Sequence, residues 1–427
     1  MKIRSIESLE ILDSRGNPTL ETTVALEDGS RGSAAVPSGA STGSYEAHEL
    51  RDNGKRFGGA GVLKAVANVE KISASLVGVE AADQKTLDDL LISLDGTENK
   101  SNLGANAMLS ISMATAVAEA VSEKKPLYEY LTKFNPDFRG RYQMPIPMMN
   151  VMNGGKHANW ATDIQEYMIF PVGLANVTEA IRACAEVYQN LKQVLKAKGY
   201  GTTVGDEGGF APAVKSNNEP FELMSEAIAK AGYVLGKDFY FGIDAAATEF
   251  YQKGVYTLKK ENRSLSSAEL ADFYVELMTK YPIISMEDIF AEDDWAGFKA
   301  FYDRYPDLQL VGDDLYVTNS KRLAQGIEQA TTNSILIKLN QIGTLSETVE
   351  TILQARGAGM SSIVSHRSGE TEDTFIADLV VAMGAGQIKT GAPARSERTA
   401  KYNRLMKIAL QLGISADYAT WPFAAVK

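Results

Sequence analysis

Phe239-Tyr240-Phe241-Gly242-Ile243-Asp244 is the first of six short apolar runs that each end in a polar or charged residue. The other five are Ile283-Ile284-Ser285-Met286-Glu287, Leu308-Gln309-Leu310-Val311-Gly312-Asp313, Ile335-Leu336-Ile337-Lys338, Ile363-Val364-Ser365-His366 and Gln387-Ile388-Lys389. Successive end residues are 43, 26, 25, 28 and 23 positions apart. A strand, a helix and two loops need about 25–30 residues. The spacing therefore predicts repeated βα units in a parallel (β/α)₈ barrel, whose active sites lie at the C-terminal ends of the strands.

The first three end residues are carboxylates, namely Asp244, Glu287 and Asp313. Carboxylates that face one point from neighbouring strands cannot all stay ionised without a cation, and oxygen ligands suit a hard ion such as Mg²⁺. Lys338 and Lys389 come from later strands and would lie across the mouth of the barrel from the acids. A metal site that faces a lysine favours proton abstraction next to a carboxylate, with the metal holding the enediolate.

A single aspartate at a strand end is most often a turn residue or a helix cap. Six consecutive strands that end in charged or ionisable groups favour a shared functional site instead. Asp288 and Asp314 each stand next to a predicted ligand, and spacing does not eliminate them as competing candidates.

The residues before this region predict a separate small domain. Strand-like segments and turns alternate up to residue 36, Pro37 to Ser44 has the composition of a mobile loop, and residues 60–131 have a helical pattern in three or four pieces. Strands followed by helices indicate an α+β domain. The proline-rich stretch 134–147 reads as a linker. We therefore expect an N-terminal domain over residues 1–135 and the barrel domain over residues 143–427.

Two glycine-rich segments carry further polar side chains. Thr202 to Phe210 predicts a strand followed by a turn with two acids, and Asn150 to Asn159 is a glycine loop that leads to residues 165–170. Each is explained equally well as a surface turn. His48 follows the predicted mobile loop in a helix-like stretch, where we expect a structural or solvent-facing role.

Composition excludes several classes of protein. The 427 residues are 44% hydrophobic and 23% charged, which is typical of a globular chain and not of a disordered one. The formal net charge of −11 argues against nucleic-acid binding and against a role at an anionic membrane surface. We expect no secretory signal and no membrane span, because the start is acidic and the longest uncharged run, residues 101–118, reads as a buried helix. The single cysteine, Cys184, lies on the apolar stripe of a helix predicted over residues 176–198 and is expected to pack there.

Seven stretches of the chain are together typical of one family. They are Ser14 to Thr19, Pro37 to Gly43, Gly205-Asp206-Glu207-Gly208-Gly209, Val311-Gly312-Asp313-Asp314-Leu315, Lys338 to Thr344, Ser365-His366-Arg367-Ser368-Gly369-Glu370-Thr371 and Ile388 to Pro393. With these stretches the sequence resembles the enolase family from Ile6 to Trp421. The resemblance implies the Mg²⁺-dependent, reversible dehydration of 2-phospho-D-glycerate to phosphoenolpyruvate in glycolysis and gluconeogenesis. It implies an α/β fold, in which a C-terminal (β/α)₈ barrel of TIM type, in the order ββαα(βα)₆, lies under an N-terminal α+β capping domain.

The resemblance also implies the catalytic roles. Lys338 would remove the C2 proton of the substrate, and Glu207, with Glu166 beside it, would protonate the departing C3 hydroxyl. A lysine has a pKa near 10.4, so a base lysine needs a depressed pKa, to which nearby Mg²⁺ and Lys389 would contribute. Glu207 must hold a proton, which burial and the neighbouring Glu166 would favour.

The binding residues follow from the same resemblance. Two Mg²⁺ ions are implied: Asp244, Glu287 and Asp313 would hold the first, and Ser41 would reach the second, which arrives with the substrate. The correspondence selects Glu287 over Asp288 and Asp313 over Asp314. The remaining implied pocket residues are Arg367 and Ser368 at the phosphate, Lys389 and Gln165 at the carboxylate, His366 on the pocket wall and His157 on a second closing loop.

Three segments depart from the usual family pattern. Ile289 stands where a proline is common, Asn159-Trp160 differs in the His157 loop, and Ile408 to Leu412 replaces a commonly acidic stretch. None of them removes an implied catalytic group. They leave loop details and subunit contacts open.

Assembly, location and alternative functions are expectations of the resemblance too. It implies a homodimer, with an octamer as the larger form, in the cytoplasm, and a secondary pool at the cell surface without a signal peptide. A related enzyme acting on a substrate without phosphate is an alternative, against which Arg367-Ser368 and the Glu166/Glu207 pair argue. Another is a non-catalytic protein that binds a partner such as plasminogen or RNA-processing machinery. The terminal Lys427 is compatible with plasminogen binding but is too weak a signal to support it.

Overall fold

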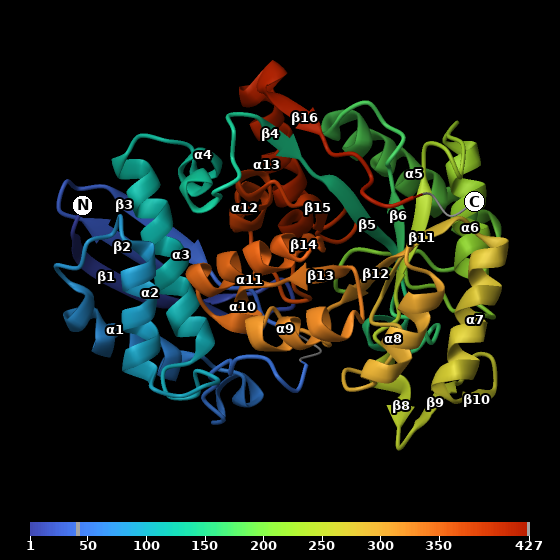
Figure 1. Ribbon diagram of the computed structural model, residues 1–427, viewed down its shortest axis with the longest axis horizontal. Coiled ribbons are helices and arrows are strands. Elements are labelled where there is room, and N and C mark those ends of the chain that lie inside the picture. Colours follow the sequence, from blue (N-terminus) through green and yellow to red (C-terminus); the bar gives the residue numbers. More distant parts are fainter. Residues whose placement is uncertain (40–42, 425–427) are drawn as a thin grey trace.

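Eight strands between Ile146 and Lys389 close into a barrel (Figure 1). The computed structural model describes residues 1–39 and 43–424, and at His157 it describes the backbone only, so Ser41 and Lys427 lie outside the described residues. The strands follow one another around the barrel as β5 (Ile146–Asn153), β6 (Glu166–Phe170), β7 (Tyr240–Asp244), β11 (Ile283–Glu287), β12 (Gln309–Gly312), β13 (Ser334–Ile337), β14 (Ser361–Ser365) and β15 (Gly386–Lys389).

Strand direction and helix order confirm the predicted enolase-type barrel. β6 runs antiparallel to both β5 and β7, and the other neighbours pair in parallel. Two helices separate β6 from β7, and one main helix follows each later strand, which gives the order ββαα(βα)₆. These helices are α5 (Val177–Ala197), α6 (Glu219–Lys230), α7 (Ser267–Lys280), α8 (Trp295–Arg304), α9 (Ser320–Gln329), α11 (Leu345–Gly357), α12 (Phe375–Met383) and α13 (Ser396–Leu412).

Local sequence signals explain where two of these helices begin. Asn176 caps α5 by accepting a hydrogen bond from the Glu179 N–H, and Ser266 forms a capping box with Glu269 at α7. Cys184 is fully buried on the apolar face of α5, as predicted. Short elements complete the barrel domain: α10 (Leu339–Ile342), the strands β8 (Tyr251–Gln252), β9 (Val255–Leu258) and β10 (Arg263–Leu265), and the pair β4 (Tyr142–Met144) and β16 (Ala416–Tyr418).

The inside of the barrel is a packed core. Seven buried apolar side chains from six of its strands form one cluster: Met148, Met168, Phe170, Ile284, Val311, Leu336 and Ile363. Inward-facing residues of this kind fill the interior of such barrels, so that there is no open channel. Polar groups are therefore directed to the C-terminal rim, where the strands end.

The N-terminal residues form the predicted α+β domain, on the left in Figure 1. Its antiparallel sheet has the order β1 (Ile3–Leu12), β2 (Pro18–Leu26) and β3 (Arg31–Ala35). Four helices follow: α1 (Leu63–Leu76), α2 (Gln84–Asp95), α3 (Ala105–Ser122) and α4 (Leu127–Leu131). α3 packs on β2 and β3, and it is buried almost all round because the sheet covers one side and other helices cover the rest. This confirms the prediction of a buried helix near residues 101–118.

The N-terminal domain touches the C-terminal rim of the barrel. Ser38 and Gly369 exchange backbone hydrogen bonds of 2.7 and 2.8 Å between N and O. The Ala47 N–H donates to the Gln341 carbonyl over 2.8 Å, on the loop region after β13. The domain therefore covers the edge where the polar strand ends are found.

Two local predictions are wrong. Residues 202–204 do not form a strand, because only Val204 pairs, through a single bridge to Phe210. The stretch around His48 is not helical: its backbone is tied to remote residues, with the His48 N–H donating to the Asn99 carbonyl over 2.7 Å. Across residues 1–39 and 43–424, no helix has both the length and the apolar character needed to cross a bilayer.

Candidate active site

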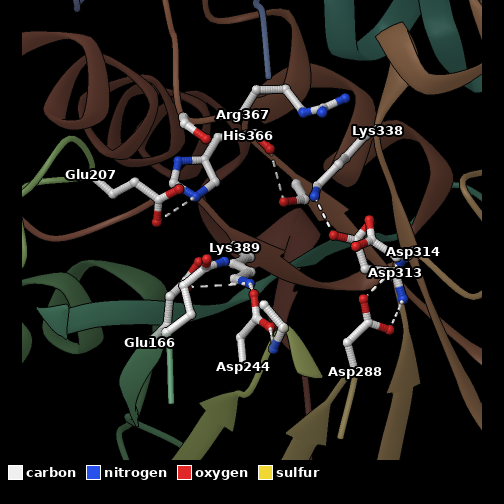
Figure 2. Close-up of a pocket in the computed structure, with 14 residues that line it drawn as sticks. Glu166, Glu207, Asp244, Asp288, Asp313, Asp314, Lys338, His366, Arg367 and Lys389 are labelled. Carbon is white, nitrogen blue, oxygen red and sulfur yellow. Dashed lines mark hydrogen bonds and ion pairs between the residues drawn. The ribbon is translucent and has the colours of Figure 1, made fainter. Parts of the chain in front are cut away.

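The C-terminal rim surrounds one polar cavity (Figure 2). Its empty volume is about 410 Å³, including the part open to solvent. Six carboxyl groups and three cationic side chains line it together with other polar groups: Gln165, Glu166, Glu207, Asp244, Asp288, Asp313, Asp314, Lys338, Ser365, His366, Arg367, Ser368 and Lys389. The excess of acids over cations favours binding of a further cation.

Strand pairing brings the acids of β6, β7 and β11 together. Asp244 lies directly opposite Glu287 in the parallel β7–β11 pair and opposite Glu166 in the antiparallel β6–β7 pair. Each is the terminal residue of its strand, so the three side chains reach the same part of the rim. Burial, and next the neighbouring carboxylates, raise the pKa of Glu287 and of Glu166 well above the usual range.

Lys389 lies in the middle of this acidic group. Its Nζ is 2.9 Å from Asp244 Oδ2, 2.9 Å from Glu287 Oε1 and 3.3 Å from Glu166 Oε2. Burial by itself lowers the pKa of Lys389, but the three carboxylates raise it well above its usual value. Lys389 is therefore a fixed cation that holds the acids at the end of β15.

Lys338 follows β13 and forms an ion pair with Asp313. Both side chains are largely buried, at 14% and 8% exposure. Burial lowers the pKa of Lys338, while the Asp313 carboxylate raises it, and the net direction is upward. The expectation of a depressed pKa applies to a site with Mg²⁺ bound; in the absence of the ion, the neighbouring carboxylates, Asp313 first, together outweigh burial and the nearby cations.

Glu207 reaches the cavity from the glycine-rich turn on the opposite side. Its Oε2 accepts a hydrogen bond of 3.0 Å from Asn150 Nδ2 and lies 3.6 Å from His366 Nε2. The turn packs tightly against Gly391, where an added Cβ would come within 2.6 Å of the Glu207 carbonyl oxygen. Gly391 therefore allows the approach that brings Glu207 next to His366, which follows β14.

Arg367 and Ser368 continue the loop after His366. Arg367 Nη1 lies 2.9 Å from Glu46 Oε2, and its Nη2 lies 3.1 Å from Glu46 Oε1, which makes a bidentate pair with the N-terminal domain. Asn340 Oδ1 accepts a further hydrogen bond of 2.9 Å from Arg367 Nη1. A planar, permanently charged guanidinium held at the cavity wall is the group that proteins use to bind phosphate.

Two family models match this chain in succession. The model for the enolase N-terminal domain matches residues 3–131, and the model for the enolase C-terminal TIM barrel domain matches residues 141–426. The chain belongs to the enolase family. Its reaction is the dehydration of 2-phosphoglycerate to phosphoenolpyruvate, and the family uses Mg²⁺.

The enolase residues predicted to bind Mg²⁺ have the right chemistry for it. Asp244, Glu287 and Asp313 present only oxygen donors, as Mg²⁺ prefers. Glu287 Oε2 is buried and has no hydrogen-bond partner among the described residues, so one carboxylate oxygen remains for a ligand. The residues present therefore fit the ion that the family requires.

A second acidic set lies close by. Ligand atoms of Asp288, Asp313 and Asp314 all come within 4.8 Å of one another. Asp288, however, accepts hydrogen bonds from the backbone N–H groups of Asp313 at 2.9 Å and Asp314 at 2.7 Å. Both of its oxygens are thus used to shape the turn after β12. This set could also hold a metal, and Asp313 is the member common to both sets.

Ile289 leaves the end of β11 in place. Its side chain is fully buried, and Glu287 is still the last residue of the strand. The carbonyl of Ile289 accepts a hydrogen bond from the Tyr274 hydroxyl over 3.1 Å. The departure from proline is therefore accommodated by packing and does not remove the predicted ligand.

The structure brings most of the predicted site residues to the lining of one cavity, Gln165 and Ser368 included. Glu287 is fully buried behind this lining and contacts Lys389, which is part of it. Ser41 and the His157 side chain lie outside the described residues. Sequence reasoning missed Asn150, Glu46 and Arg398, which contact Glu207, Arg367 and His366. Asn150 and Glu46 lie in or beside segments that the sequence marked as unusual, but no pattern indicates a buried contact for Arg398.

Proposed function

We propose that Lys338 and Glu207 carry out the two proton transfers of the enolase reaction from opposite sides of the substrate. The observation that carries this proposal is their placement across one cavity, with Lys338 after β13 and Glu207 on the turn before α6 (Figure 2). Lys338 Nζ accepts the C2 proton, and Glu207 gives a proton to the departing C3 hydroxyl, which leaves as water. Glu166 and Glu207 lie beside each other, and two neighbouring carboxyl groups favour the state in which one of them is protonated.

The other pocket residues bind and orient the substrate in this proposal. Arg367 and Ser368 hold the phosphate, and Lys389 and Gln165 lie toward the carboxylate. His366 forms the wall next to Glu207, and His157 belongs to a second loop that closes over the substrate. Lid closure from the N-terminal domain keeps water away from the reacting carbons.

We assign the first Mg²⁺ to Asp244, Glu287 and Asp313, and a second ion, which arrives with the substrate, to a site reached by Ser41. When bound, the ions offset the second negative charge that forms on the substrate carboxylate as the C2 proton leaves. The choice of Glu287 over Asp288 is supported by the two backbone hydrogen bonds that occupy Asp288, whereas Glu287 Oε2 has no hydrogen-bond partner among the described residues. Asp313, when it holds the ion, would no longer be a free counter-charge for Lys338, whose pKa it now raises.

We further propose a division into a capping domain of residues 1–135 and a barrel domain of residues 143–427. The gap between the two matched ranges, residues 132–140, supports it. A homodimer in the cytoplasm is the proposed working form, with an octamer as the larger alternative.

The experiment that tests the proposed roles is steady-state turnover of 2-phosphoglycerate, followed by the ultraviolet absorbance of phosphoenolpyruvate. Wild type and Lys338→Ala are compared with Mg²⁺ and with EDTA. Mg²⁺-dependent turnover that is lost in the variant supports the assigned base. Turnover that survives in Lys338→Ala contradicts that assignment while leaving the enolase reaction in place.

A further inference from the structure

Arg398 is a fully buried arginine next to the cavity, on the first turn of α13. Its guanidinium donates four hydrogen bonds. Nη1 lies 2.6 Å from His366 Nδ1 and 2.5 Å from the Arg367 carbonyl oxygen. Nη2 lies 2.6 Å from the Ser368 carbonyl oxygen and 3.2 Å from that of Asp206. All four N–H groups of the two terminal nitrogens are therefore used.

The contact with His366 determines where the imidazole carries its proton. A guanidinium only donates hydrogen bonds, so His366 Nδ1 must be the acceptor and cannot be protonated. The proton of the neutral ring is then on Nε2, which lies 3.6 Å from Glu207 Oε2. Burial, supported by the positive charge of Arg398, lowers the pKa of His366 well below its usual value against the opposing effect of Glu207. His366 is thus neutral and presents an N–H group to the acid.

The three carbonyl contacts join two separate loops. Asp206 precedes Glu207 on the turn before α6, while Arg367 and Ser368 belong to the loop after β14. In the sequence, Arg398 is 192 residues away from Asp206 and 30 residues away from Ser368. One side chain therefore fixes the loop that carries the acid relative to the loop that binds the phosphate.

We propose that Arg398 is a positioning residue for the acid step, which fixes His366 as the Nε2–H tautomer facing Glu207 and holds the acid loop against the phosphate loop. This inference rests on the proposed role of Glu207. When Glu207 gives its proton to the leaving hydroxyl, water forms and a carboxylate remains. The Nε2–H group of His366 is then a further donor, besides Asn150 Nδ2, that faces this carboxylate and stabilises it.

The first test is the tautomer of His366 in the wild-type protein, read from ¹⁵N NMR of the imidazole nitrogens. The chain has three histidines, so His48→Gln and His157→Gln variants assign the His366 signals by elimination. A proton on Nε2 with Nδ1 unprotonated is the expected result. A proton on Nδ1, in the neutral ring or in imidazolium, would overturn the inference whatever the activity of the enzyme.

The second test compares Arg398→Lys with Arg404→Lys. Arg404 lies on the same helix but pairs with Asp378, away from the cavity, so it is a matched control. Lysine at position 398 cannot make all four contacts, and displacement of the acid is expected to lower kcat about 10- to 100-fold, more than it changes KM. The variant is also expected to show a mixture of His366 tautomers, while Arg404→Lys keeps both the wild-type tautomer and wild-type kcat.

The outcomes separate this inference from the proposed function. An Arg398→Lys protein with the wild-type tautomer and unchanged kcat overturns the inference. If Arg398→Lys does not fold, the wild-type spectrum still decides the tautomer. A Glu207→Gln variant that retains full turnover contradicts the acid role of Glu207 but leaves the measured tautomer unchanged.

Discussion

The mouth of the barrel has an acidic half and a basic half. The acids Glu166, Asp244, Glu287 and Asp313 lie at the rim ends of β6, β7, β11 and β12, whereas Lys338, Arg367 and Lys389 lie at the rim ends of β13, β14 and β15. Strand order around the barrel follows chain order here, so a run of acids followed by a run of bases in the sequence becomes two facing halves in space. Each lysine of the basic half is paired with carboxylates of the acidic half, so that each half offsets the charge of the other.

Removal of the divalent ions is the strongest test of the difference between the two halves. Treatment with EDTA is expected to abolish turnover of 2-phosphoglycerate, because the acidic half then has only Lys389 and Lys338 to offset it and the substrate carboxylate has no counter-charge. Phosphoenolpyruvate absorbance measures the loss. Excess Mg²⁺ should restore the rate, and turnover that persists in metal-free protein would refute the metal role of the acidic half.

Lys338→Ala is expected to have the next largest effect, since it removes the base from the basic half. A positioned general base contributes about 10²–10⁴-fold, so kcat should fall by roughly that factor. Exchange of the C2 proton with deuterated solvent, followed by NMR, should fall equally. Lys321→Ala is the control, because Lys321 is 76% exposed on α9, and circular dichroism checks that the variant folds.

Glu207→Gln tests the acid on the other side of the cavity. The amide cannot donate a proton to the leaving hydroxyl, so we expect dehydration to slow by about 10²–10³-fold. Exchange at C2 should persist, because Lys338 is intact. Glu226→Gln, which changes an exposed side chain on α6, is the control. Loss of C2 exchange in Glu207→Gln would contradict the assignment of the C2 proton to Lys338 alone and of the C3 hydroxyl to Glu207.

The smallest expected effect distinguishes the two acidic sets near Asp313. Asp288→Asn keeps one acceptor oxygen for the turn after β12 and should weaken Mg²⁺ binding only about 10-fold, as changes to groups that orient ligands do. Asp244→Asn removes a charged ligand and should weaken binding by more than about 100-fold. Isothermal titration calorimetry with Mg²⁺ measures both. The reverse order of effects would move the first metal to the Asp288 set.

The regular part of the molecule was predictable because its signals are local. The six apolar runs became six strands, and five of the six polar residues at their ends line the cavity, with Glu287 buried behind it. β1, β2 and β3 also lie in the part of the chain up to residue 36, where strand-like segments and turns were predicted to alternate. Apolar runs, turns and strand ends repeat at short range, and a single sequence carries that information.

The remainder depends on contacts between distant residues. The chain around His48 is not helical because Asn99, Asn106 and Gln341 bind its backbone, which no local pattern reveals. Spacing also gave equal weight to Asp288 and Glu287; the family resemblance favoured Glu287, and the hydrogen bonds of Asp288 to the turn after β12 give the physical reason. Arg398 reads as a solvent-facing charge at the start of a helix, yet it is buried because three carbonyl groups and an imidazole receive its protons.

Lys389 also has a consequence for how the chain is made. It follows Asp244 by 145 residues and Glu287 by 102, and its strand β15 closes the barrel against β5. At about 5–20 residues per second, a ribosome that has released Asp244 needs roughly 7–30 s more to reach Lys389. During that interval the nascent acids lack their internal counter-ion. Barrel closure therefore waits until β15 has been made, and Lys389 arrives with that strand as the counter-ion of the acids.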